Sequence, residues 1–475
     1  MKSLPYRHTK IVFTIGPATN DPSVLQELLH AGVDVCRLNM AHATREWTAE
    51  ALRNVDAACK AAGRRISIMM DIKGPEIRTG HLEDAIELER GETFDFFIDP
   101  DAAPVLEGVR GVSVNYPRLL EDIEVGNTIL VDSGLLRLRV EDIMEDRVRC
   151  SVRISGPLGS RRHINLPGVH VKLPALTEKD HNDIDIGIEQ GVDFFALSFV
   201  RTPEDLETLR RSLSEKGSKA QIIAKIEDQS AISNLDDIIA ASDGLMVARG
   251  DLGIEIPYET LPLVQRRAIR TCQRMGKPAI VATHMLESMI QNPLPTRAEI
   301  SDIANAVHEQ ADAIMLSGET TVGKYPVECV NVMNRIIRAV QAQGENRYND
   351  QLVLKTAKGR MLKAAMILSD EIGDSFITVF TRRGILARTP SALRPLHSPV
   401  FAFTDDEAVF KNLLLYWGVE PFFMKFEEDF EQTILNAYHR LKKGGWAKEG
   451  DSSVIITNVL AREHVVETIQ YRTVC

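Results

Sequence analysis

Three charged residues near the middle of the chain have the types and spacing of a metal-assisted site for an anionic substrate. Lys225 and Glu227 lie two residues apart at the end of one apolar run, so an extended strand points both side chains to the same face. Asp251 ends the next apolar run, in Ala-Arg-Gly-Asp-Leu-Gly at 248–253. Two carboxylates with few other ligands suit Mg²⁺ or Mn²⁺, and Lys225 would then face a phosphoryl group held by that metal. Read alone, the pair is equally well an ordinary ion pair, and Asp251 a turn residue.

Arginines and polar oxygens at other run ends are further binding candidates. Arg37 and Arg78 are phosphate candidates, because a guanidinium buried near a strand end needs an anionic partner. The alternative for Arg37 is a structural ion pair with a neighbouring acid such as Asp71. Asn39 and Asp71 offer oxygens that could hold a monovalent cation or orient Arg37.

Glycines and hydroxyls complete the set of candidates. Gly250 and Gly253 would let backbone N–H groups approach an oxyanion closely. Thr283 and Ser317 end two further runs, and hydroxyls in such positions are more often satisfied core groups than catalysts. Their place at strand ends makes them candidates for a proton relay and no more.

The runs that carry these residues must position them. Short runs rich in Val, Ile, Leu and Ala, separated by helical segments, are typical of buried parallel strands. Eight such runs predict a closed (β/α)₈ barrel of the TIM type, in which the carboxyl ends of the strands meet over one mouth. Residues at those ends, Ser198 included, should therefore share one site. The runs are 11–17, 32–39, 66–71, 193–198, 221–225, 244–251, 278–283 and 313–317.

The spacing of the runs breaks after the third one and stops after the eighth. The long stretch between about 81 and 172 has short, alternating β-type segments, which predicts an inserted β-barrel-like domain on the catalytic face, a candidate lid. Beyond about residue 345, runs at 376–381, 399–404 and 452–457 with helical segments predict a separate C-terminal α/β domain. The predicted limits are 1–75 and 173–345 for the barrel, 76–172 for the lid and 346–475 for the C-terminal domain.

Composition excludes several classes of protein. A formal net charge of −11 argues against a general nucleic-acid binder, so any phosphate site must come from a local basic cluster. The chain has no stretch of about eighteen apolar residues, so no membrane span is predicted. The first ten residues are polar and have no signal-peptide core. The six cysteines have no Cys-x-x-Cys spacing, which favours reduced thiols in a cytoplasmic protein.

From about residue 10 to 345 the chain resembles pyruvate kinase, whose motifs occur in the family's order. The two most specific matches are Asp-Ile-Lys-Gly-Pro-Glu-Ile-Arg-Thr-Gly at 71–80 and Met-Leu-Ser-Gly-Glu-Thr at 315–320. The resemblance also covers the layout of a barrel, a β domain inserted after the third strand and a C-terminal α/β domain. It implies transfer of the phosphoryl group of phosphoenolpyruvate to ADP, giving pyruvate and ATP, in the last step of glycolysis. The other matching segments are 10–17, 37–42, 165–168, 223–227, 246–253, 282–289 and 295–299.

The resemblance also implies roles for the phosphoenolpyruvate side of the site. Lys225 neutralises charge on the phosphoryl group and on the enolate, while Glu227 and Asp251 hold Mg²⁺ or Mn²⁺. Arg37 grips the phosphate. The carboxylate end of the substrate and the region that protonates the enolate are implied to involve Gly250, Asp251, Thr283 and Ser317.

For the nucleotide, the resemblance implies contacts from the barrel and from the lid. The implied nucleotide residues are Asn39, His42, Arg78 and Arg162. Potassium would be held by Asn39, Asp71 and the backbone carbonyl of Ile72. The family's hydroxyl ligand is replaced here by Ala41, whereas Glu76 is of the type that goes with potassium dependence. We therefore expect potassium use, weakened or altered. A homotetramer is what the family suggests.

The C-terminal domain departs most from the family pattern. The segment 381–386 has two arginines where a Ser/Thr-rich phosphate loop is usual, and 458–464 has no glycine. These departures argue against a sugar bisphosphate effector bound in the usual way. Arg382, Arg383 and Arg394 are interpreted as a solvated basic surface rather than a site for another anionic effector.

Two alternatives to a kinase stay open on these motifs. A lyase that acts at a Mg²⁺-bound enolate on a related barrel would need the same metal pair and arginine, but not the nucleotide-facing Arg78 and Arg162. A catalytically silent regulatory paralogue would be expected to lose Lys225, Glu227 or Asp251, and all three are present.

Overall fold

The structure is a computed structural model of the 475-residue chain. It describes residues 6–41, 43–99, 108–343, 354, 356–395, 397–461 and 464–475, without the side chains of 458–461 and 464–466. Two features predicted above lie at least partly outside the described residues, namely His42 and the segment 458–464.

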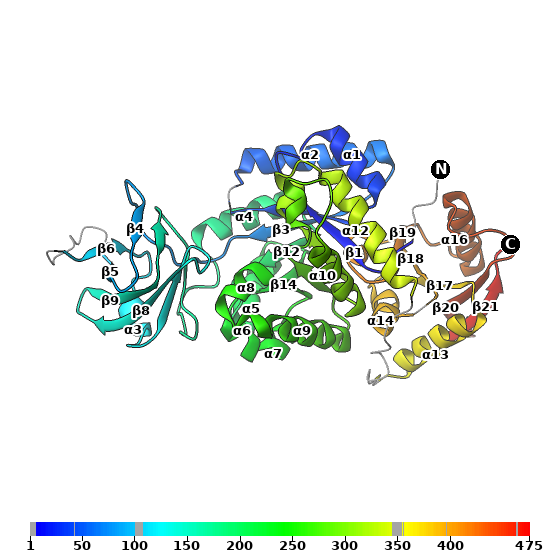
Figure 1. The fold of residues 1–475 in the computed structure, drawn as a ribbon. Helices are drawn as coiled ribbons and strands as arrows, with labels where there is room; N and C mark the ends of the chain where they lie inside the picture. Colours follow the sequence, from blue (N-terminus) through cyan, green and yellow to red (C-terminus); the bar gives the residue numbers. More distant parts are fainter. Residues whose placement is uncertain are drawn as a thin grey trace.

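The eight predicted runs all form strands of one closed, parallel barrel (Figure 1). Going round the barrel, the order is β1-β16-β15-β14-β13-β12-β3-β2, so the predicted (β/α)₈ architecture is confirmed. The strands are β1 (Lys10–Thr14), β2 (Val35–Asn39), β3 (Ser67–Ile72), β12 (Phe194–Leu197), β13 (Gln221–Ile226), β14 (Gly244–Ala248), β15 (Ala279–Ala282) and β16 (Ala313–Leu316).

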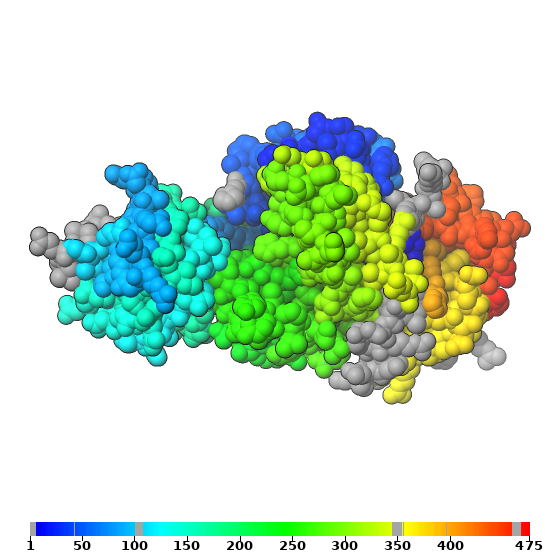
Figure 2. Space-filling view, in the orientation of Figure 1, coloured from blue at the N-terminus to red at the C-terminus, as the bar shows by residue number. Residues whose placement is uncertain are grey.

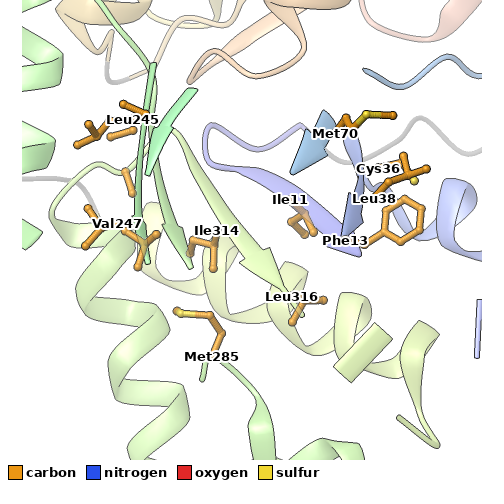
Figure 3. Close-up of a cluster of buried hydrophobic side chains, with 14 of the residues drawn as sticks. Ile11, Phe13, Cys36, Leu38, Met70, Leu245, Val247, Met285, Ile314 and Leu316 are labelled. Carbon is orange, nitrogen blue, oxygen red and sulfur yellow. The ribbon is translucent and has the colours of Figure 1, made fainter. Parts of the chain in front are cut away.

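Side chains on these strands alternate between two separate cores. Ile11 and Phe13 of β1 face the surrounding helices, whereas Val12 between them joins the cluster inside the barrel. Figure 3 shows the outer cluster, in which β2 and β16 contribute pairs at the same two-residue spacing, Leu38 with Cys36 and Leu316 with Ile314. Burial on both faces is why these runs are continuously apolar.

The barrel helices begin where the sequence has start signals. Thr177 and Asp180 form a reciprocal capping box, with Thr177 N donating to Asp180 Oδ2 at 2.7 Å. None of the helices that the structure describes is long and apolar enough to cross a membrane. The helices are α1 (Pro22–Ala31), α2 (Arg45–Ala62), α4 (Glu178–Glu189), α5 (Pro203–Glu215), α6 (Gln229–Ser233), α7 (Leu235–Ala241), α8 (Arg249–Glu255), η1 (Tyr258–Thr260), α9 (Leu261–Met275), η2 (Glu287–Ile290), α10 (Arg297–His308), α11 (Gly318–Thr321) and α12 (Pro326–Gln341).

The predicted insertion leaves the barrel after β3 and returns before α4, so it stands at the carboxyl ends of the strands. It has its own apolar core, and it consists of a six-stranded sheet in the order β11-β7-β8-β9-β5-β6 and a two-stranded pair of β10 with β4. Figure 2 shows this domain as a separate mass beside the barrel. Its elements are β4 (Ile86–Leu88), β5 (Thr93–Phe97), β6 (Arg110–Ser113), α3 (Leu119–Asp122), β7 (Thr128–Val131), β8 (Leu136–Ile143), β9 (Arg147–Ile154), β10 (Gly156–Leu158) and β11 (Ile164–Asn165).

The C-terminal domain is a five-stranded α/β sheet with an apolar cluster on each face. Its order is β19-β18-β17-β20-β21, and only the last pair is antiparallel. The three predicted strands correspond to β17, β18 and β20. The elements are α13 (Ala357–Ile372), β17 (Ser375–Phe380), α14 (Ile385–Leu393), β18 (Val400–Thr404), α15 (Glu407–Leu413), β19 (Val419–Phe423), α16 (Phe430–Gly444), β20 (Ser452–Ala461) and β21 (His464–Thr473). The exact domain limits stay a prediction.

This domain closes the end of the barrel opposite the mouth (Figure 1). Leu415 is fully buried and belongs to the cluster inside the barrel, although it comes from the C-terminal domain. At the start of β1, the buried Lys10 donates from Nζ to the carbonyl of Val419 at 2.6 Å. The bottom of the barrel core is therefore completed by a segment more than 70 residues beyond the barrel's last helix.

The interpretation of Arg394 as solvated basic surface is wrong. Its side chain is 2% exposed, and its guanidinium pairs with both carboxylate oxygens of Asp312, at 3.0 and 2.8 Å. Because Asp312 immediately precedes β16, this ion pair joins the C-terminal domain to the bottom of the barrel. Arg382, in contrast, is 71% exposed and pairs with Asp405.

Candidate active site

Lys225 lies at the centre of the charges at the mouth, where β13 ends. Its Nζ is 2.8 Å from Glu227 Oε1 and 3.1 Å from Asp71 Oδ1, and it donates to Ser198 Oγ at 2.7 Å. Burial opposes the charge of this ammonium, but Asp71 and Glu227 outweigh that effect, so the pKa of Lys225 lies above its ordinary value. Lys225 is therefore a cation at the mouth. The ion pair between Lys225 and Glu227, which was the alternative interpretation of these two residues, is present.

Arg37 and Asp71 also form the ion pair that was one of the two readings of Arg37. Arg37 Nε donates to Asp71 Oδ2 at 2.7 Å, and Nη1 donates to Thr14 Oγ1 at 3.0 Å. Burial would raise the pKa of Asp71, but Lys225 and Arg37 together hold it below its ordinary value. Within the described residues no acceptor meets Nη2 of Arg37, so the pairing orients the guanidinium and leaves one edge available to an anion.

Glu227 and Asp251 are two carboxylates with unequal surroundings. Glu227 is buried, and its Oε2 accepts from Phe199 N at 2.8 Å. Burial raises its pKa to about 7 against the pull of Lys225, and the charge of Asp251 adds to that rise. Asp251 is half-buried in the first turn of α8, and no described residue gives its carboxylate a hydrogen bond or ion pair.

This pair of acids fits a divalent cation that completes its coordination with water and substrate. Two mutually repelling carboxylates, one of them without a cationic partner, gain most from a bound cation. Among the described residues no group of three or more His, Cys, Asp or Glu side chains could hold a metal.

Thr283 and Ser317 lie at the ends of β15 and β16, with different hydroxyl environments. Thr283 Oγ1 accepts from Gly250 N at 2.8 Å and donates to Ala282 O at 2.7 Å. The N–H of Gly250 is thus already bound to Thr283 rather than open to an oxyanion. The hydroxyl of Ser317 is buried and has no hydrogen-bond partner among the described residues. A buried, unpartnered hydroxyl is costly, and a bound water or substrate would satisfy it.

The predicted potassium ligands lie together but are partly engaged. Asn39 and Asp71 are register partners across β2 and β3. Asn39 is exposed, and its Oδ1 accepts from Ala41 N at 3.1 Å. The carbonyl of Ile72 accepts from Ser198 Oγ at 2.8 Å.

The predicted nucleotide arginines lie side by side where the inserted domain begins and ends. Arg78 Nη1 donates to Arg161 O at 2.8 Å, and its Nε binds Glu76 at 2.7 Å. The backbone N–H of Thr79 donates to the carbonyl of Arg162 at 2.8 Å, and the backbone N–H of Arg162 donates to Thr79 Oγ1, also at 2.8 Å. Half of the Arg162 side chain is exposed, and it reaches Asp132 only at 3.4 Å.

Sequence reasoning missed Arg249, which holds the Thr283 turn. Thr283 has a left-handed backbone, with φ of +68°, and Arg249 Nη2 donates to its carbonyl at 2.7 Å. Asp302 of α10 binds the same guanidinium at 2.7 Å. The sequence did offer a signal. Arg249 stands directly after an apolar run, in the Ala-Arg-Gly-Asp segment, and a charged residue at the end of a buried strand needs a partner.

It also missed the residues through which the inserted domain touches the barrel. Asn165 Nδ2 donates to Glu255 Oε1 of α8 at 2.7 Å. The ring of His163 lies 5.8 Å from the ring of Phe199, which follows β12. These contacts join segments far apart in sequence, so no local pattern indicates them.

The buried Glu255 gives a testable pH dependence of stability. Burial and the charge of Asp228 raise the pKa of Glu255 to about 7, against the hydrogen bond from Asn165. The folded chain therefore binds this proton more tightly than the unfolded chain, and the stabilisation present below the unfolded pKa is lost as pH rises through about 7. Glu255→Gln keeps an acceptor for Asn165 and removes the titration.

We expect Glu255→Gln to match the wild type near pH 5 and to exceed its unfolding free energy at pH 8, by up to about 3 kcal/mol. Urea unfolding at both pH values measures this difference. Glu259→Gln, at a nearby exposed position, is the control. Parallel pH profiles for wild type and Glu255→Gln would contradict the assignment.

Comparison with known proteins agrees with this geometry. The chain matches the family model "Pyruvate kinase, barrel domain" over residues 6–330 and "Pyruvate kinase, alpha/beta domain" over residues 360–469. Plastidial pyruvate kinase 2 of Arabidopsis thaliana is 41% identical over 478 residues, covering 98% of this chain and 81% of the relative. Pyruvate kinase of Bacillus licheniformis is 42% identical over 464 residues, covering 94% and 77%. That of Staphylococcus aureus (strain MRSA252) is 40% identical over 468 residues, covering 95% and 78%.

Proposed function

This chain belongs to the pyruvate kinase family, and we propose that it transfers the phosphoryl group of phosphoenolpyruvate to ADP. The bond between phosphorus and the enol oxygen breaks, a bond to the terminal phosphate oxygen of ADP forms, and the enolate takes a proton at carbon to give pyruvate. The observation that carries the proposal is the buried Lys225, fixed between Asp71 and Glu227 at the barrel mouth beside Arg37.

Lys225 and Arg37 are the cations proposed to act on the migrating group. A loose phosphoryl-transfer transition state spreads negative charge over its oxygens, so positioned cations stabilise it more than covalent chemistry would. Asp71 holds both cations, which fixes them before substrate binds. Glu227 and Asp251 would hold Mg²⁺ or Mn²⁺, which would supply positive charge to offset the negative charge of the reacting groups.

The other site residues are assigned to the ends of the substrate and to the nucleotide. Ser317 is proposed for the region that protonates the enolate, because no residue in the described part of the chain forms a hydrogen bond with its buried hydroxyl, and Thr283 lies at the end of the neighbouring strand. Gly250 and Thr283 would line the carboxylate end. Arg78 and Arg162, at the exposed junction with the inserted domain, are proposed to bind ADP phosphates, together with Asn39 and His42, which lies outside the described residues.

The test is turnover of phosphoenolpyruvate and ADP with Mg²⁺, assayed for both products. Equal amounts of pyruvate and ATP are expected. Neither family models nor relatives favour the lyase or the silent paralogue. Pyruvate without ATP would indicate enolate chemistry of another kind, and no product at all would indicate a regulatory paralogue.

We propose that potassium activates this enzyme less than it would with a hydroxyl at position 41. Ala41 has no side-chain oxygen that could bind the cation. Its backbone N–H donates a hydrogen bond to Oδ1 of Asn39, which is another proposed ligand. Ala41→Ser is therefore expected to raise the ratio of rates in potassium and tetramethylammonium chloride several-fold, at matched ionic strength. Ala43→Ser, two residues on, is the matched control. If Ala41→Ser left the ratio of the two rates unchanged, the result would contradict the proposal that Asn39 and its neighbours hold the potassium ion.

A homotetramer and a cytoplasmic location stay predictions. The prediction of a homotetramer rests on membership of the family. The relatives include plastidial proteins of plants as well as bacterial ones. Sedimentation of the purified chain tests the first prediction, and fractionation of its source cells tests the second.

A further inference from the structure

Phe199 has an unusual backbone conformation beside the proposed metal site. It follows Ser198 at the end of β12 and has φ of +54°, a left-handed value that costs a bulky residue free energy. This conformation directs the N–H of Phe199 at Glu227 Oε2, 2.8 Å away. Because Lys225 binds Oε1 of the same carboxylate, the strained turn fixes which way Glu227 faces.

The side chain of Phe199 makes a second contact, with the inserted domain. Its ring lies 5.8 Å from the ring of His163, at an interplanar angle of 56°. His163 forms a β-bridge with Arg78 and directly follows Arg162. One residue of the barrel mouth thus contacts both a proposed metal ligand and His163, which follows the proposed nucleotide residue Arg162 and is bridged to the other one, Arg78.

We propose that Phe199 is a positioning residue that ties the placement of the nucleotide-binding edge of the inserted domain to the orientation of Glu227. Its backbone N–H holds the metal ligand, and its ring holds the inserted domain through His163. The inference rests on the proposed function, which identifies the two ligands as a divalent metal ion and ADP. It has a consequence for binding, because coupling between two sites is reciprocal: metal and ADP each favour the arrangement that the other needs.

Two substitutions at Phe199 separate the backbone part from the ring part. Asn tolerates the left-handed conformation, so Phe199→Asn keeps the N–H in place and removes the ring. Val is β-branched and disfavours that conformation, so Phe199→Val displaces the N–H. His163→Ala removes the ring contact from the other side and leaves the turn untouched.

Binding is measured without turnover, on the full chain. The Mn²⁺ dissociation constant comes from the electron paramagnetic resonance signal of free Mn²⁺, and the ADP dissociation constant from calorimetry at saturating Mn²⁺. We expect Phe199→Asn and His163→Ala to bind Mn²⁺ within about twofold of wild type and ADP about 3- to 10-fold more weakly, the range for a lost aromatic contact. Combining them should add no further loss, because both remove one contact.

We expect Phe199→Val to weaken Mn²⁺ binding about tenfold, the effect of lost support for a metal ligand. Asp374→Val is the matched control, since Asp374 is also left-handed, with φ of +41°, but is exposed in the C-terminal domain. It should bind Mn²⁺ like wild type. Asp251→Asn, which changes a proposed metal ligand, serves as the reference for the Mn²⁺ affinity of a damaged metal site.

The outcomes distinguish this inference from the proposed function. Wild-type Mn²⁺ affinity in a folded Phe199→Val would overturn the role of the N–H. Wild-type ADP affinity in both Phe199→Asn and His163→Ala would overturn the role of the ring. If the wild type forms no ATP from phosphoenolpyruvate and ADP while the binding constants change as described, the function fails and the positioning role of Phe199 stands.

Discussion

Lys225→Met should lower kcat for pyruvate formation by about 10³-fold or more, with a much smaller change in KM for ADP. The ammonium lies between Asp71 and Glu227 in a buried site, where a charge acts with little screening. Met has a similar length and no charge, so the space stays filled while the stabilisation of the transition state is lost. Steady-state kinetics with saturating Mg²⁺ and both substrates measures the effect.

The same substitution also tests whether the loss is chemical or structural. Lys225 pairs with two carboxylates, so its removal should lower stability, but removing a cation beside Glu227 should preserve Mn²⁺ binding. Lys10→Met is the matched control, because Lys10 is also buried and lies at the other end of the barrel. Near-normal turnover in Lys225→Met, or an equal loss in Lys10→Met, would contradict the role given to Lys225.

The barrel and the shared position of its strand ends could be predicted because both follow from local pattern. A strand buried on both faces must be apolar throughout, and a polar residue directly after it lies at the mouth in this architecture. Lys225, Asp71 and Ser198 come from three such runs and meet within hydrogen-bonding distance. For Arg37 the ion pair with Asp71 is present, and phosphate binding stays a prediction, with Nη2 meeting no acceptor among the described residues.

The unpredicted features depend on contacts between distant segments. The turns at Phe199 and Thr283 have left-handed backbones without the glycine that would indicate such a conformation in the sequence. Glu227 and Arg249, which follow the ends of other strands, hold these two turns by hydrogen bonds. The strands β19 and β21 were not predicted, and β21 owes its place to antiparallel pairing with β20. Arg394 resembles any surface arginine in sequence, since its partner Asp312 lies 82 residues away.

The ion pair of Arg394 with Asp312 carries the second large prediction, which concerns stability. Both side chains are 2% exposed, and Asp312 also accepts from the backbone N–H groups of Trp417, at 3.1 Å, and Ala279, at 3.0 Å. Arg394→Met should therefore lower the unfolding free energy by about 3 to 5 kcal/mol, because it leaves a buried carboxylate without its cation. Urea unfolding measures the loss.

Adding Asp312→Asn to Arg394→Met should recover much of that stability, because the unpaired charge is then gone while acceptance from one backbone N–H remains. Arg382→Met, which breaks an exposed pair with Asp405, should cost at most about 1 kcal/mol. The folded fraction of each variant should keep wild-type kcat, since Asp312 precedes β16 at the end of the barrel away from Lys225. A double variant less stable than Arg394→Met would show that the carboxylate holds Trp417 and Ala279 by itself. The C-terminal domain would then be joined to the barrel through Asp312 alone and not through the ion pair.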